Sequence, residues 1–250
     1  MGKRIKKMLF FLLLAVLIII IAAILFTIFF DQAVITRRDT IYHVASSEKV
    51  VALTFDDGPS PKWTPQILDV LKEGQAKATF FMLGEHVEKY PEVARRVASE
   101  GHEIGNHTYD HHTLIYYKAP ELEKEINDAQ AAIFKATGLT TKYFRPPKAW
   151  LTENEKKDIK RMGYEVILWS LNSKDWVTFD DRFIVKYILH YVHPGDILLF
   201  HDSGGVFKPE GGNRKETVKA VSRLIGKLKE RGYRFVTISE LLKLQLKDEK

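Results

Sequence analysis

The feature that most constrains this chain is an uninterrupted apolar run, Met8–Phe30, which contains no charged residue, no proline and no glycine. A helix over this run is long enough to cross the roughly 30 Å hydrocarbon core of a lipid bilayer. Four basic residues precede the run and Asp31 follows it, so the positive-inside rule predicts a cytoplasmic N-terminus. We therefore expect a cytoplasmic segment at 1–7, a transmembrane anchor in the cell membrane at 8–30, and an extracellular remainder.

A cleaved signal peptide is the alternative interpretation of this segment. The apolar core of a signal peptide usually has about 7–15 residues and is followed by small residues at the cleavage site. The bulky residues Ile28, Phe29 and Phe30 occupy that end here. The sequence therefore favours an uncleaved, single-pass anchor.

The composition of the rest of the chain restricts the chemistry that is possible. About 200 residues follow the anchor, which is enough for one domain with a sizeable core. The chain has no cysteine, so disulfides and thiolate metal sites are excluded. The net charge is only +6, and no Lys/Arg-rich run accompanies an aromatic platform. Nucleic acid is therefore not an expected partner.

Extended apolar runs alternate with amphipathic helical stretches over residues 49–246, which we expect to form one domain after a stalk at 31–48. The charged tail at 247–250 is expected to be frayed. Alternating strands and helices with short connections predict parallel strands covered by helices. Seven such units suggest a barrel, complete or not, and an open doubly wound sheet is the alternative. The chain lacks GxGxxG and GxxxxGK[ST], so no nucleotide partner is expected. The expected strands are Val50–Thr54, Ala78–Leu83, Glu103–Gly105, Lys142–Phe144, Glu165–Leu171, Asp196–Phe200 and Arg234–Thr237. The expected helices are Thr64–Lys72, Pro91–Ser99, Ala119–Thr137, Thr152–Met162, Arg182–Val192, Lys215–Arg231 and Ser239–Leu246.

Polar residues that can do chemistry follow five of the predicted strands directly. The carboxyl ends of parallel barrel strands converge on one mouth, where such enzymes keep their active sites. Five separate segments thus indicate a single site. The residues are Asp56 and Asp57, His107 and His111, Arg145, Asp175 and Trp176, and His201 and Asp202.

Two histidines and a carboxylate predict a metal site at this mouth. His107 and His111 have the i, i+4 spacing at which two imidazoles project from one face of a helical turn. Neighbouring side chains of an extended segment point to opposite sides, so one aspartate of the pair can bind the metal while the other faces substrate. Amide hydrolysis also needs a base and an acid, which the second aspartate and His201 could supply. Arg145 would then be the charge partner of a carboxylate.

These motifs, in this order, resemble those of the polysaccharide deacetylases, carbohydrate esterase family 4, with its nodulation-type deacetylase domain. The likeness covers about residues 49–245, and TFDDGP followed by HTxxH is its most specific part. The five motifs are Thr54–Pro59, His107–His111, Arg145–Pro147, Asp175–Trp176 and Leu199–His201.

The resemblance implies a distorted (β/α) barrel of seven or eight strands and a metal-dependent hydrolase that removes N-acetyl groups from a polysaccharide. It implies that the metal, usually Zn²⁺ or Co²⁺, is bound by Asp57, His107 and His111. It further implies that Asp56 is the general base and is oriented by Arg145, and that His201 is the general acid and is tuned by Asp175. The N–H of Lys148, beside Pro147, would be the oxyanion donor. Trp176 and Leu199 would form the walls of the acetyl pocket, and Thr108 would support the metal-binding histidines.

The sequence departs from the family pattern at two places. Lys148 stands where an aromatic residue is usual and is followed by Ala149 rather than glycine, and Asn172 stands where the fourth motif usually starts with aspartate. The branch of the family that acts on muramic residues also has a basic residue at the first place. Lys148 would then meet a substrate carboxylate, or else point to solvent.

We expect N-deacetylation of N-acetylhexosamine residues in an extracellular polymer, with bacterial peptidoglycan as the first candidate because the anchor would hold the domain beside the cell wall. Chitin-type oligosaccharides and a secreted exopolysaccharide are the alternative substrates. A catalytically inactive wall-binding module and a metal-dependent phosphoesterase are the alternative functions.

Overall fold

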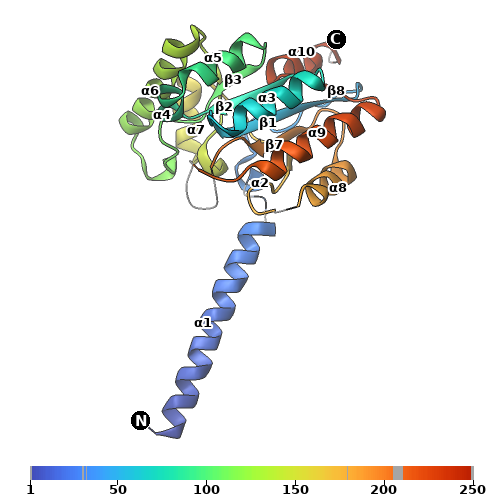
Figure 1. Ribbon diagram of the computed structural model, residues 1–250. Coiled ribbons are helices and arrows are strands. Elements are labelled where there is room, and N and C mark those ends of the chain that lie inside the picture. Colours follow the sequence, from blue (N-terminus) through green and yellow to red (C-terminus); the bar gives the residue numbers. More distant parts are fainter. Residues whose placement is uncertain (1, 30, 32, 179, 205–210, 249–250) are drawn as a thin grey trace.

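The N-terminal helix α1 (Lys3–Phe29) projects away from the folded domain (Figure 1). Its part Lys3–Ala22 is long and apolar enough to cross a membrane, and none of that part is buried against the rest of the chain. An N-terminal signal sequence would share these properties, so the helix is compatible with an anchor or with a signal. The computed structural model describes residues 2–29, 31, 33–178, 180–204 and 211–248, so Phe30 of the expected anchor and 249–250 of the expected tail lie outside it.

The domain is built on one sheet of eight parallel strands, in the order β5-β4-β3-β2-β1-β7-β6, with β8 paired to the start of β1. Strand β1 therefore lies at the centre, between β2 and β7. The strands are β1 Val50–Gly58, β2 Ala78–Met82, β3 Glu103–Asn106, β4 Tyr143–Phe144, β5 Glu165–Val166, β6 Leu171–Asn172, β7 Ile197–His201 and β8 Arg234–Phe235.

The sheet must curl because its two edge strands are close in sequence. Strand β5 ends at Val166 and β6 begins at Leu171, and a chain of that length spans at most about 18 Å. A flat sheet of seven strands would be about 29 Å wide at the usual strand spacing. The predicted distorted (β/α) barrel is thus confirmed, and the open doubly wound sheet is wrong. The single strand expected at Glu165–Leu171 is also wrong, because the chain leaves one edge of the sheet there and joins the other.

Helices cover the outer face of the curled sheet (Figure 1). The expected helix Ala119–Thr137 has the same bounds in the structure, from a proline in its first turn to Gly138 with a left-handed φ of 72° after it. The short helices α2 and α4 and two 3₁₀ turns were not expected. The helices of the domain are α2 Ala33–Thr36, α3 Trp63–Glu73, α4 Gly84–Lys89, α5 Pro91–Ser99, α6 Ala119–Thr137, α7 Glu153–Arg161, α8 Asp181–Tyr191, α9 Lys215–Glu230 and α10 Ile238–Asp248, and the 3₁₀ turns are η1 Leu114–Tyr116 and η2 Pro147–Ala149.

Strand β1 positions the site because its side chains alternate between two layers. Leu53 and Phe55 point outward into the core under the helices, where the Phe55 ring stacks on Phe80 with 5.0 Å between centroids. Thr54 and Asp56 both accept hydrogen bonds from the fully buried Arg145. The polar residues of the strand are thus gathered on the barrel's inner side.

Part of the segment expected to be a stalk belongs to the folded domain. Ile41 lies between the two sheet edges, donating its N–H to Val166 O at 2.9 Å and accepting from Leu168 N–H at 2.7 Å. Ala33 and Val44 are fully buried. This segment packs here because the gap between β5 and β6 leaves backbone groups and apolar side chains that need partners.

Candidate active site

Three side chains, one from the end of β1 and two from the loop after β3, meet at the carboxyl end of the central strands. Asp57 Oδ1 lies 3.2 Å from His111 Nε2 and 3.5 Å from His107 Nε2. Asp57 and His107 are buried and His111 is half-buried. Their possible ligand atoms all lie within 4.8 Å of one another. The structure therefore brings together the three side chains that the family resemblance assigns to the metal.

The loop that carries the two histidines is not the helical turn expected from their i, i+4 spacing. Residues 107–113 form no helix, and the backbone has φ of 73° at Thr108 and 67° at His111. Hydrogen bonds hold this loop: Thr108 N–H donates to Asn106 Oδ1, and His111 N–H donates to Thr108 Oγ1 at 3.1 Å. Thr108 therefore fixes the backbone of His111.

The two aspartates of the pair face the same site, contrary to the expectation for an extended segment. Asp57 has a φ of 73°, and the pairing of β1 with β2 shifts register between Asp56 and Gly58. This turn brings Asp57 back toward the side of Asp56, whose Oδ2 lies 3.9 Å from His107 Nε2. Both carboxylates can thus act on one bound group.

The donor set fits a divalent ion. Asp57 Oδ1 is buried and, among the described residues, has no hydrogen-bond donor, which is costly for a carboxylate without a cation. His107 Nδ1 lies 2.7 Å from Arg145 O and so is the ring nitrogen that carries the proton, which leaves Nε2 free to bind a metal. Two histidines and one carboxylate form an open site of the type that Zn²⁺ occupies in hydrolases.

Electrostatics hold these groups in the protonation states that bind metals. Burial raises the pKa of Asp57, but the proximity of His111 and His107 more than compensates, and the net pKa lies below that of an ordinary aspartate. Burial lowers the pKa of His111 to about 4, despite the opposing charge of Asp57. At neutral pH the aspartate is ionised and His111 is neutral, as a ligand must be.

Asp56 is fixed by a buried arginine. Arg145 Nη1 donates to Asp56 Oδ1 at 2.7 Å and to Thr54 Oγ1 at 2.8 Å. Its other nitrogens donate to the carbonyl oxygens of Ile167 and Leu168, both at 3.1 Å. The guanidinium is thus satisfied on several sides, and Asp56 keeps one oxygen, Oδ2, directed toward the histidines.

His201 faces the same site from the neighbouring strand. It pairs in register with Asp56, which places the two side chains beside each other on adjacent strands. His201 Nδ1 donates to Asp175 Oδ1 at 2.8 Å, and His201 N–H donates to Asp175 Oδ2 at 2.9 Å. Burial lowers the pKa of His201, but the Asp175 carboxylate has the larger combined effect and the pKa is raised above its ordinary value. This arrangement leaves His201 Nε2 as a proton donor.

The remaining residues that the sequence assigned to the site are Lys148, Pro147, Leu199 and Trp176, and they differ in exposure and in hydrogen bonding. Lys148 has a left-handed φ of 57°, its side chain is exposed, and its Nζ lies 3.4 Å from Thr113 Oγ1. Lys148 N–H makes no backbone hydrogen bond with the described residues. Pro147 and Leu199 are buried, while Trp176 is half-buried and no described contact joins it to the metal cluster.

Two residues that support the acid were missed by the sequence analysis. Thr217 Oγ1 donates to Asp175 Oδ2 at 2.9 Å, and the buried Arg214 donates to Asp175 O at 3.3 Å and to Ser203 O at 2.8 Å. Both come from the segment around the start of α9, about 40 residues after Asp175. The one signal in the sequence was an arginine placed shortly after Gly211 and Gly212.

Asp202, which the sequence analysis grouped with His201 without giving it a role, is fully buried. Its carboxyl accepts a hydrogen bond from Thr64 Oγ1 and lies so close to Gly58 that a Cβ there would come within 2.2 Å of Oδ2. Burial raises the pKa of Asp202 to about 7. A side chain at position 58 of the DDGP segment would therefore collide with the buried carboxyl group of Asp202.

Comparisons with known proteins agree with this geometry. The sequence profile described as polysaccharide deacetylase matches residues 43–167. A peptidoglycan-N-acetylglucosamine deacetylase of Bacillus cereus is 39% identical over 204 residues, which cover 81% of this chain and 92% of that protein. The peptidoglycan-N-acetylmuramic acid deacetylase PdaA of Bacillus subtilis is 31% identical over 214 residues, covering 84% and 78%. The crystal structure of the Bc1960 peptidoglycan N-acetylglucosamine deacetylase superposes with a TM-score of 0.76 at 34% identity, covering 84% of this chain and 96% of that one.

Proposed function

The chain belongs to the polysaccharide deacetylase family, and on that premise we propose that it removes acetyl groups from N-acetylhexosamine residues of peptidoglycan with the help of one divalent ion. It is a polysaccharide N-deacetylase, a hydrolase of amide bonds. The observation that carries the metal-dependent proposal is the unpartnered Asp57 Oδ1 between two histidine Nε2 atoms, next to Asp56 and His201.

Each protein group has a defined task in the proposed reaction. Asp57, His107 and His111 would hold the ion, which when bound lowers the pKa of a water molecule and polarises a carbonyl. Asp56, held in place by Arg145, accepts the proton of the attacking water. The free N–H of Lys148 donates to the carbonyl oxygen as negative charge develops on it. His201 then protonates the departing amine, and acetate and a free amino sugar leave.

The substrate is assigned from the relatives together with the expected location of the domain. Peptidoglycan is the polymer in the names of the relatives, whose sugars are N-acetylglucosamine in one and N-acetylmuramic acid in another. Helix α1, if retained as an anchor, would hold the catalytic domain on the outer side of the cell membrane, beside the wall. Zn²⁺ is the ion that we propose, since the ligands are two imidazoles and a carboxylate.

The activity should have an alkaline limit set by His201. A raised pKa keeps the imidazole protonated to higher pH, and the rate should fall as pH rises through that pKa because the proton donor is lost. In Asp175→Asn the charge that raises the pKa is gone, so the alkaline limb of the kcat profile should move to lower pH by about one unit or more. If the alkaline limb of the kcat profile lies at the same pH in both proteins, His201 is not the general acid.

Acetate release and product mass spectrometry test the proposed function. The full-length chain, solubilised in detergent and loaded with Zn²⁺, is incubated with purified peptidoglycan, with a chitooligosaccharide and with an acetylated exopolysaccharide. We expect acetate and a mass loss of one acetyl group per modified sugar from peptidoglycan. Release from the other polymers alone would reassign the substrate. No release from any acetylated glycan would favour the inactive wall-binding module, which binds peptidoglycan without turnover.

A further inference from the structure

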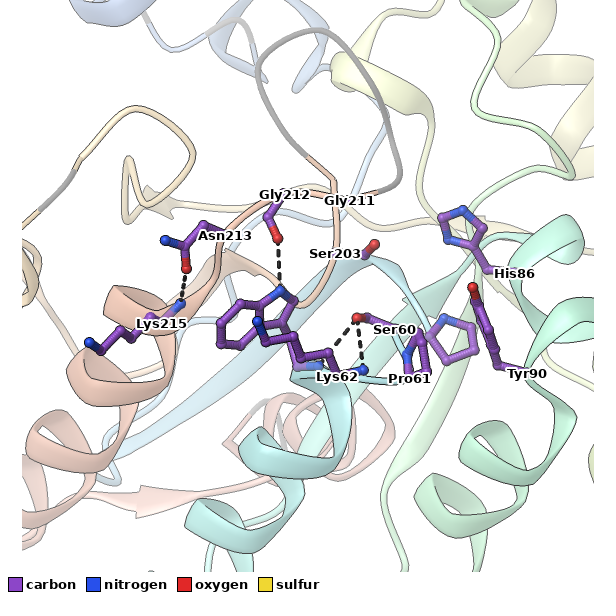
Figure 2. A pocket seen from close by; sticks show the side chains of 12 residues that line it. Ser60, Pro61, Lys62, His86, Tyr90, Ser203, Gly211, Gly212, Asn213 and Lys215 are labelled. Carbon is purple, nitrogen blue, oxygen red and sulfur yellow. Dashed lines mark hydrogen bonds between the residues drawn. The ribbon is translucent and has the colours of Figure 1, made fainter.

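A pocket beside the site is lined by residues that follow β1 and β7 (Figure 2). Its volume is about 510 Å³, within the range of small-molecule sites. Its walls come from the segments after β1 and β7 and from helix α4. Pro59 follows Asp57 by two residues and Ser203 follows His201 by two, so the wall begins within about 7 Å of the site along either strand. A substituent on the sugar that is being deacetylated could therefore enter it.

The walls of this pocket are held in place by hydrogen bonds. Trp63 Nε1 donates to Gly212 O at 2.7 Å, which ties the segment after β1 to the segment before α9 (Figure 2). Ser60 Oγ accepts from Trp63 N–H at 3.2 Å, and Ser60 N–H donates to Thr64 Oγ1 at 2.7 Å. A pocket with such fixed walls can bind a ligand at a small cost in conformational entropy.

The described part of the pocket carries two lysines and no acidic residue. Lys62 is the N-cap residue of α3 and Lys215 is the first residue of α9. Both lysines thus lie at the positive end of a helix dipole, where a basic side chain is unfavourable and an anion is favourable. None of the described residues that line the pocket is acidic. Neither lysine forms an ion pair with a described residue. An anionic ligand would therefore offset the unfavourable position of the two basic side chains at helix N-termini.

A buried histidine gives the pocket a second recognition element. His86 is only 2% exposed and lines the pocket, and its Nδ1 donates to Asp57 O at 2.7 Å. The opposite ring nitrogen, Nε2, has no hydrogen bond to a described residue and is the acceptor of the neutral ring. A ligand that suits both features has a carboxylate for the lysines and an N–H or O–H for His86.

We propose that this pocket binds the acidic peptide arm of the glycan substrate, an inference that rests on the proposed function. A peptide arm offers side-chain or terminal carboxylates together with amide N–H groups, and it is attached to the sugar next to the acetamide. A neutral chitin-type chain has no carboxylate. The pocket would thus select peptide-bearing peptidoglycan over neutral N-acetylated glycans, and His86 would connect an occupied pocket directly to the backbone of Asp57.

Substrate competition tests this proposal. kcat/KM is measured for a peptide-bearing muramyl oligosaccharide, for the same oligosaccharide after removal of its peptide, and for chitotetraose. The Lys62→Gln/Lys215→Gln variant should lower the preference for the peptide-bearing substrate over chitotetraose about five- to tenfold, mainly through KM, because each charge contact contributes a few-fold. The control Lys135→Gln/Lys229→Gln removes the same charge from exposed positions outside the pocket and should keep the preference. Added salt should reduce the preference in the unmodified chain.

The substrates also identify the source of the carboxylate. If the double lysine variant loses kcat/KM only on the peptide-bearing substrate, the pocket binds a carboxylate of the peptide. If it loses kcat/KM equally on the peptide-free oligosaccharide, the pocket binds the lactyl carboxylate instead. An unchanged preference in the pocket variant overturns the proposal. Should the chain release no acetate at all, the proposed function fails separately. Calorimetric titration of a muramyl peptide into the Asp56→Asn chain then tests the pocket without turnover. The peptide should bind several-fold more weakly once both lysines are replaced. Equal binding with and without the lysines overturns the proposal.

Discussion

Asparagine in place of Asp56 lowers kcat by about 10²-fold or more, with the fold and the metal content retained. Asn has the same shape and can still accept the hydrogen bond that Arg145 Nη1 donates to Oδ1 at 2.7 Å. It cannot accept a proton from water, so only the base is lost. The measurement is the steady-state rate of acetate release, with zinc content determined on the same sample.

The neighbouring aspartate provides the matched comparison. Asp57→Asn changes the group whose Oδ1 lies between His107 and His111, so this variant should lose the ion as well as the activity. Both variants should be nearly inactive, but only Asp57→Asn should lose the bound metal. Metal content therefore distinguishes the base from the ligand. Full activity of Asp56→Asn, or equal metal loss in both variants, would contradict the assignment of base and ligand.

Methionine in place of Arg145 lowers the free energy of unfolding by about 3–5 kcal/mol. Arg145 is fully buried, its guanidinium lies 4.0 Å from the centroid of the Phe81 ring, and its loss leaves Asp56 as a buried carboxylate without a cation. The carbonyl oxygens of Ile167 and Leu168 lose their donors at the same time. Urea unfolding of the detergent-solubilised chain, followed by circular dichroism, measures the effect.

The control for this prediction is an arginine with two ion pairs at the surface. Arg96 contacts Asp69 and Glu100, but its side chain is 35% exposed. Arg96→Met should cost about 1 kcal/mol or less because water replaces the lost contacts. Equal destabilisation by the two variants would mean that burial of the Arg145–Asp56 pair is not what makes it important. The double variant Asp56→Asn/Arg145→Met should recover part of the stability, since no buried charge then remains.

Local signals in the sequence predicted the regular elements well, and tertiary closure was what they could not show. Helix α6 was predicted to the residue because a proline and a glycine mark its two ends. The break between β5 and β6 has no such mark, since Glu165–Leu171 is one extended run whose halves pair with opposite edges of the sheet. The packing of Ile41 between those edges depends on the same closure.

The types of residue in the site were predictable from the sequence, but the backbone conformation that orients their side chains was not. Asp57 and His111 have positive φ values, which alternation in a strand and i, i+4 spacing in a helix both fail to anticipate. Asp57, His107 and His111 come together because of these two turns rather than through the periodicities that first indicated the site. Thr217 and Arg214 escaped notice because their partner, Asp175, lies about 40 residues earlier and neither residue belongs to a motif.

Zinc bound per chain, measured alongside acetate release during stepwise removal by a chelator, tests the central claim most directly. If Asp57, His107 and His111 form the metal site, activity should fall in proportion to zinc, reach background as the last equivalent leaves, and return with one equivalent of added ion. Hydrolysis that continues undiminished in the metal-free chain would contradict the account.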